Sequence, residues 1–274
     1  MQKQYYYLVS SLPELAFDSG KSAVGINEFI QFCSEELDGR DFETLKKIFL
    51  FNDIRNASNY TTEGHKFVYP SFYSEEEFTE NLKDTDSFFV FLGEYFFNKK
   101  SDKRLFPELI EIDEVVKLLY KYLDEISSGF LKDYFLFELY LQNVTAALSL
   151  RANDINYSNK IIDADYISEQ IKKSSSPDFG ISKEVDYLEK LIELYKSNDL
   201  IKIEKTIENI RWQWLDDRVG IDYFSLDAIL AYSVKLCSVE RWLGLSEDKG
   251  DATLNSLIDN ISSNVAFPEE YLRR

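Results

Sequence analysis

Apolar residues recur at intervals of three and four along most of the chain, which is the spacing of amphipathic α-helices. The clearest pattern runs from Leu109 to Ile126 and ends before Gly129. The following segment, residues 130–154, is apolar around more of its circumference, as in a helix that packs on several sides. Only 10 Gly and 5 Pro interrupt these patterns. The sequence therefore predicts an all-α fold made of multi-helix antiparallel bundle lobes.

Other helices are expected where similar patterns continue. Ser74 and Glu77 have capping-box spacing, which predicts the start of a helix. Tyr5–Ser10 suits an edge strand or the start of a helix, and we favour the helix. The remaining predicted helices cover residues 25–37, 41–55, 84–97, 163–173, 182–196, 199–215, 222–243 and 251–262.

Two polar segments interrupt the helical pattern. Residues 56–70 carry turn-forming residues and are expected to form an excursion on the surface. The break at residues 174–180 suggests an N-terminal and central lobe over residues 1–174 and a C-terminal lobe over residues 181–274. One compact domain is the alternative to this division.

The sequence holds one faint internal echo. Residues 51–56 form an apolar helical stretch that carries Asn, and they resemble residues 141–143 with Arg151 downstream. No fixed period of 20 to 50 residues runs through the chain. The echo therefore does not predict a regular repeat architecture.

The composition narrows the classes of partner. The 274 residues include 31 Lys and Arg and 49 Asp and Glu, a net charge of −18. Such a charge disfavours binding to nucleic acid or to anionic lipid. Hydrophobic residues make up 45% and aromatic residues 15%, which is typical of a folded globular protein and not of an acidic disordered chain.

Few residues offer catalytic or metal-binding chemistry. His65 is the single histidine, and Cys33 and Cys237 lie far apart without CxxC spacing, so no zinc site, redox dithiol or disulfide is expected. We expect His65 to be solvated and both thiols to be buried. The acidic runs at residues 75–77 and 216–217 are expected to face water. With no phosphate-binding, zincin or nucleophile-elbow motif present, we predict no catalytic residue, cofactor or metal.

The N-terminal segment and the apolar runs bear on localisation. The opening MQKQYYYLVSSLP lacks the apolar stretch of a secretory signal, and no run approaches 18 uninterrupted apolar residues. The sequence therefore predicts a cytoplasmic protein without direct membrane insertion.

Two pairs of residues suit either packing or recognition. Trp212 and Trp214 lie on different sides of a predicted helix, so one can serve as an interface anchor, although core packing of both is favoured. Arg151 and Arg241 lie at the ends of apolar helices, where a cation suits the helix dipole or pairs with a buried acid. We assign both arginines structural roles first.

Two helices resemble the C subunit, called d in eukaryotes, of V-type and A-type ATPases. Residues 140–152 resemble a helix of that family in their spacing of Asn and Arg, and residues 226–257 resemble its last long helix. The opening YYYLVSSLPEL also resembles an uncharacterised bacterial family whose members accompany V-type ATPase subunits. The positions that match the family motif, as structural or interface residues, are Asn143, Arg151, Tyr232, Glu240 and Arg241.

The resemblance implies a non-catalytic socket between the central shaft and the membrane rotor ring, which passes torque without binding nucleotide. Members of that family are longer and consist of three similar helical lobes that form a funnel. The partners implied are the ATPase shaft and ring subunits, and the location implied is the inner membrane periphery. The alternatives are an acidic helical adaptor or assembly factor for another complex and, third, a hydrolase with paired carboxylates.

Overall fold

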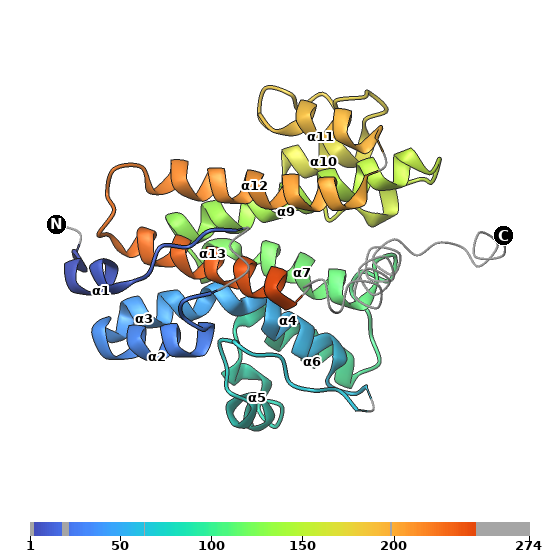
Figure 1. Ribbon diagram of the computed structural model, residues 1–274. Coiled ribbons are helices and arrows are strands. Elements are labelled where there is room, and N and C mark those ends of the chain that lie inside the picture. Colours follow the sequence, from blue (N-terminus) through green and yellow to red (C-terminus); the bar gives the residue numbers. More distant parts are fainter. Residues whose placement is uncertain (1–2, 18–21, 63, 198, 245–274) are drawn as a thin grey trace. The chain divides into compact units, whose positions relative to one another are not determined.

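The computed structural model describes residues 3–17, 22–62, 64–197 and 199–244. Figure 1 shows that the regular elements in these ranges are helices, and none of the described residues forms a strand. The predicted all-α fold is confirmed. The helix expected at residues 251–262 lies outside the described residues.

The chain divides into two units that differ from the lobes expected from the sequence. Among the described residues, unit 1 contains residues 3–17, 22–38 and 208–244, and unit 2 contains residues 39–62, 64–197 and 199–207. The polar break at residues 174–180 therefore lies within unit 2. The first two helices belong with the C-terminal part of the chain because α2 packs against the last described helix, α13, and α1 packs against α2.

Unit 1 is built around α13. Its helices are α1 (Tyr6–Ser11), α2 (Ile26–Glu36), the part of α12 (Leu200–Val219) that begins at Glu208, and α13 (Leu226–Gly244). The α2 helix packs against both α1 and α13. The Phe29 ring is fully buried and lies 5.3 Å from the ring of Tyr232, measured between centroids. The helix favoured for Tyr5–Ser10 is confirmed by α1.

Unit 2 packs its helices in two groups. The α7 helix contacts α4 and α6, and α9 contacts α10 and α11. The elements in chain order are α3 (Gly39–Lys46), η1 (Lys47–Phe49), α4 (Leu50–Asn59), α5 (Glu75–Asn81), η2 (Thr85–Ser87), α6 (Val90–Lys100), α7 (Glu111–Lys121), α8 (Leu123–Ile126), α9 (Phe130–Ala152), η3 (Ser158–Lys160), α10 (Tyr166–Lys173), α11 (Leu188–Tyr195) and the start of α12.

Several predicted helices are shorter or divided in the structure. The helix expected over residues 84–97 separates into η2 and α6, and the one expected over residues 182–196 begins only at Leu188. The capping box at Ser74 forms as predicted: its hydroxyl accepts a hydrogen bond from the Glu77 N–H, and the Glu77 carboxylate accepts one from the Ser74 N–H. The sequence therefore predicted this capping box correctly. The points at which the longer predicted helices are divided depend on tertiary packing.

The prediction that residues 56–70 form a surface excursion is wrong for the first of these residues. Residues 56–59 continue α4, and Asn56, Ala57 and Ser58 are buried. Polarity suggested exposure, but the Asn56 side chain has hydrogen-bond partners inside unit 2, so its burial is compensated.

One glycine marks a close approach between backbones in unit 2. A Cβ added to Gly93 in α6 would lie 2.8 Å from the carbonyl oxygen of Thr85 in η2. Because a backbone carbonyl cannot rotate away as a side chain does, a methyl group at this position forces α6 and η2 apart.

We predict that Gly93→Ala lowers the free energy of unfolding by about 2 kcal/mol, because overpacking outweighs the better helix propensity of Ala. Urea denaturation followed by far-UV circular dichroism measures this change. Gly39→Ala is the matched control, since no atom lies within 4 Å of the added Cβ in α3. Equal losses in both variants would contradict the packing argument.

Candidate functional site

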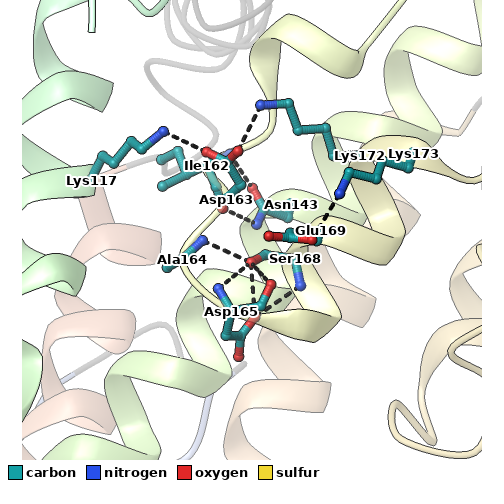
Figure 2. A network of polar contacts seen from close by, with 10 residues as sticks. All are labelled: Lys117, Asn143, Ile162, Asp163, Ala164, Asp165, Ser168, Glu169, Lys172 and Lys173. Atoms are coloured by element: carbon teal, nitrogen blue, oxygen red, sulfur yellow. Dashed lines mark hydrogen bonds and ion pairs between the residues drawn. The ribbon is translucent and has the colours of Figure 1, made fainter. Parts of the chain in front are cut away.

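A buried asparagine joins α9 to the segment that precedes α10. Asn143 is 1% exposed. Its Nδ2 donates a hydrogen bond of 2.9 Å to the carbonyl oxygen of Ile162, and its Oδ1 accepts one of 3.0 Å from the N–H of the same residue. We call this arrangement an asparagine bridge: one side-chain amide that satisfies both backbone groups of one downstream residue. Figure 2 shows the bridge and the polar groups around it.

The asparagine bridge is followed by a capped helix start. Asp165 accepts a hydrogen bond from the Ser168 N–H, and the Ser168 hydroxyl accepts one from the Asp165 N–H, so α10 begins with a capping box (Figure 2). The Tyr140 hydroxyl donates to the Asp165 carboxylate from one helical turn before Asn143. The capped end of α10 is thereby tied to α9.

Two lysines surround the carboxylate of Asp163. Lys117 from α7 lies 2.5 Å from it and Lys172 from α10 lies 2.8 Å from it (Figure 2). Burial alone would raise the pKa of Asp163, but the hydrogen bonds and charges of the two lysines lower it below its usual range. Asp163, which follows Ile162, therefore stays ionised. It links α7, α10 and the segment between α9 and α10.

The same arrangement occurs in α4. Asn56 is fully buried, its Nδ2 donates to the carbonyl oxygen of Val68 at 3.1 Å, and its Oδ1 accepts from the Val68 N–H at 2.8 Å. Three residues earlier, the Asp53 carboxylate accepts hydrogen bonds from the N–H groups of Phe72 and Tyr73, next to the capped start of α5. Unit 2 therefore contains two asparagine bridges, each followed by a helix with a capping box.

The second bridge differs in its charge. Burial raises the pKa of Asp53 to about 7, and the two backbone N–H groups act in the opposite direction. Tyr140 holds the corresponding place before Asn143. In both sites this residue lies three positions before the bridging asparagine, but Tyr140 donates a hydrogen bond there and Asp53 accepts.

The faint echo in the sequence lies in the same two helices, but it does not mark both bridging residues, because Arg55 precedes Asn56 whereas Arg151 follows Asn143. Asn56 pairs with a residue 12 positions downstream and Asn143 with one 19 positions downstream. The two connecting segments therefore differ by seven residues, and two copies of one arrangement do not make a repeating period. The signal that could have found the second bridge is the shared order of buried Asn, polar segment and capping box.

Arg151 binds the segment at residues 174–177. Its guanidinium donates to the carbonyl oxygens of Ser176 at 2.9 Å and Pro177 at 3.1 Å, and to the Tyr157 hydroxyl at 2.8 Å. The carbon of the guanidinium lies 4.2 Å from the centroid of the Phe179 ring. These contacts hold the polar break against α9, which explains why it does not separate two units.

In unit 1, a buried carboxylate on α12 joins this helix to α13. Glu208 is 1% exposed and forms an ion pair of 2.6 Å with Arg211. It also pairs with Arg241 and accepts a hydrogen bond from the Ser238 hydroxyl. Burial would raise the pKa of Glu208, but the charges of the two arginines and the hydroxyl lower it below its usual range. We call these four residues the Glu208 cluster.

The other motif residues of α13 bind the N-terminal part of unit 1. Glu240 accepts a hydrogen bond of 2.7 Å from the N–H of Ile26, the first residue of α2. The Tyr232 hydroxyl donates to the Pro13 carbonyl oxygen at 2.9 Å. Tyr232, Glu240 and Arg241 are thus brought together in unit 1, while Asn143 and Arg151 both act in unit 2.

The side chains of the two tryptophans expected as interface anchors are partly buried within unit 1. Trp212 and Trp214 are both half-buried. The Trp212 indole donates a hydrogen bond of 3.4 Å to Ser238, and the Phe17 ring lies 6.0 Å from it. Trp214 also has a contact partner. These residues therefore have structural roles whether or not a partner binds.

A different apolar surface was missed in the sequence. Four large side chains of unit 1 are exposed: Tyr6 by 60%, Tyr7 by 69%, Ile221 by 92% and Tyr223 by 62%. They lie on α1 and on the turn between α12 and α13, which Figure 1 shows side by side, and the Tyr5 N–H donates to the Phe224 carbonyl oxygen at 2.7 Å. We call these four residues the end surface. Tyr6 and Tyr7 lie within the element expected at Tyr5–Ser10, for which the sequence allowed a strand or a helix, so the sequence did not show which side chains would be exposed.

The single histidine and the two cysteines do not form a shared site. The Nε2 atom of His65 is buried and has no hydrogen-bond partner among the described residues, so this histidine is less solvated than expected. Cys33 is buried, but Cys237 is only partly buried, and both are free thiols whose pKa burial raises to about 12. Within the described ranges no group of three potential metal ligands occurs. None of the described helices has the length and apolarity needed to cross a bilayer.

Comparison with known proteins assigns the chain to one family. The chain belongs to the family described as protein of unknown function (DUF2764), whose model matches residues 1–265. No curated protein and no solved structure matches the chain. Because the match extends over both units, it includes the asparagine bridges and the Glu208 cluster.

Asn143→Ala is expected to lower the free energy of unfolding by about 3 kcal/mol, because both backbone groups of the buried Ile162 lose their partner. Urea denaturation measures the loss, and amide hydrogen exchange of Ile162 should become faster. Gln142→Ala removes an exposed amide from the neighbouring position and should change stability by less than about 0.5 kcal/mol. Unchanged exchange at Ile162 would show that the bridge is not required.

Glu208→Gln should lower the stability of unit 1 by about 3 kcal/mol at pH 7, since two arginines lose their buried counter-charge. In the unchanged protein the ionised carboxylate stabilises the fold above the unfolded-state pKa, and this stabilisation is lost as the pH falls through the lowered folded-state pKa. The difference between the two proteins should therefore shrink in acid. Tryptophan fluorescence during urea unfolding at pH 7 and below pH 4 tests this, with Asp217→Asn, an exposed acid on α12, as control.

Proposed function

We propose that this member of the DUF2764 family is a non-catalytic component of a bacterial V/A-type ATPase, similar to the C subunit of those enzymes, that couples the central shaft to the membrane rotor ring. The proposal rests on the resemblance of the Asn143–Arg151 helix and of the α13 helix to that protein. The family match itself carries no function. The support for the proposal therefore comes from the contacts that the motif residues make in the fold.

The observation that carries the proposal is the repeated asparagine bridge. The resemblance implies a protein built of similar helical lobes, and unit 2 contains two helices that each hold a downstream segment through one buried asparagine. In both cases a helix with a capping box follows. Two copies of one local arrangement are what a shortened relative of a multi-lobed protein would retain.

The second support is the internal role of the motif residues. A part that transmits torque must resist deformation, and a buried polar contact resists it because breaking the contact exposes unpaired groups to an apolar interior. Arg241 and Glu240 join helices in unit 1, and Asn143 and Arg151 join helices to loops in unit 2. Each motif residue therefore stiffens the unit in which it lies.

The third support is a surface suited to another protein. The end surface exposes three tyrosines and one isoleucine, and aromatic side chains are favoured where protein partners bind. The net charge of −18 would steer a partner that presents basic patches. We assign this surface to contact with an ATPase shaft or ring protein.

The tagged protein, purified in mild detergent from membranes of its own cells, should enrich the ATPase shaft and ring subunits over an untagged control in mass spectrometry. Recovery alone, or with an unrelated complex, would contradict the proposal and favour the adaptor function. Raising the ionic strength should weaken the capture, because exposed charges are screened.

Tyr7→Ser combined with Ile221→Ser should reduce this capture, since both changes remove apolar contact from the end surface. Tyr166→Ser is the matched control because Tyr166 in α10 is 69% exposed, like Tyr7, but lies in unit 2. Thermal unfolding must first show that both variants remain folded. Equal capture by the two variants would contradict the assignment of the end surface.

A further inference from the structure

A cavity in unit 2 lies beside the C-terminal end of α9. Its volume is about 630 Å³, and it is bounded by α9, the segment at residues 175–177 and the end of α11. This volume falls within the range of roughly 300 to 1,000 Å³ that is typical of small-molecule sites. Leu148, Pro177 and Ile192 supply apolar walls.

The charge of the cavity is opposite to that of the chain. Arg151 and Lys196 line it, and none of its lining residues is Asp or Glu, although acids outnumber bases by 18 in the sequence. Within the described residues, neither cation forms an ion pair with a carboxylate, because Arg151 binds carbonyl and hydroxyl oxygens. The hollow is therefore lined by two positively charged residues that have no carboxylate partner among the described residues.

The cavity also offers neutral hydrogen-bond donors. Burial, followed by the charge of Glu204, raises the pKa of Tyr195, so its hydroxyl keeps its proton. This hydroxyl makes no hydrogen bond within the described residues. Arg151 uses four of its five N–H donors on Ser174, Ser176, Pro177 and Tyr157, which leaves its Nε–H.

We propose that this cavity binds an organic anion, a carboxylate or phosphate group attached to an apolar body. The anionic group pairs with Lys196 and accepts hydrogen bonds from Tyr195 and from the Nε–H of Arg151, while the apolar body packs against Leu148 and Ile192. Arg151 is already held in place by its backbone contacts, so its charge is positioned before a ligand arrives. The proposal is independent of the role in an ATPase.

Isothermal titration calorimetry on the full chain tests the site with four probes. Phenyl phosphate and 3-phenylpropionate carry both the anion and the apolar body, inorganic phosphate carries only the anion, and 3-phenylpropanol carries only the body. We expect saturable binding of at least one of the first two, and at least about fivefold weaker binding of the other two, because each lacks one half of the recognised chemistry.

Two variants place the binding in this cavity. Lys196→Gln should weaken the bound probe about fivefold, and Tyr195→Phe about tenfold, because it removes a hydrogen bond to a charged group. Lys190→Gln is the matched control, since Lys190 is an exposed lysine of α11 that does not line the cavity. Two-dimensional amide NMR should show shifts at Ala152 and Asn153 on titration, and these shifts do not depend on stability.

Three results would overturn the proposal. The first is no saturable binding of either anionic probe at millimolar concentration. The second is equal binding of 3-phenylpropanol, which would show that charge is not recognised. The third is equal weakening by Lys196→Gln and Lys190→Gln, which would show that the lysines act only through the overall charge.

Discussion

The need to pair buried backbone groups shapes unit 2 more than any other constraint. Where the chain passes between two helices against the core, its N–H and C=O groups lose water, fully at Ile162 and partly at Val68. At Val68 and Ile162 the partner is a single asparagine amide, which supplies one acceptor and one donor in the geometry of a neighbouring backbone. Each bridge thereby fixes where its following helix begins, and α5 and α10 both begin with a capping box.

In unit 1 the buried polar group that needs partners is a charged side chain. Glu208 is buried on α12, and without partners its carboxylate would be destabilised by the loss of water and would take up a proton. Arg211, Arg241 and Ser238 satisfy it, and two of these three residues come from α13. Glu240, next to Arg241, binds the first turn of α2. One stretch of α13 therefore holds α12 through Ser238 and Arg241 and holds α2 through Glu240.

These contacts show what the five residues behind the proposed ATPase role do in the fold. The five motif residues are not arranged as a catalytic constellation, since two lie in unit 2 and three in unit 1, and each one joins segments of its own unit. A motif of this type specifies a rigid framework. The end surface lies apart from the five motif residues, whereas the cavity is lined by one of them, Arg151.

The sequence by itself determined the helical class, the approximate place of most helices and the capping box at Ser74, because these depend on local periodicity and on side chains within one turn. Only the tertiary structure decided that Asn56 is buried, that the break at residues 174–180 stays attached to α9, and that the first helices belong with α13. Each of these depends on a partner far along the chain. A polar residue is read as exposed until that partner is placed, because its cost of burial vanishes only when its hydrogen bonds are made.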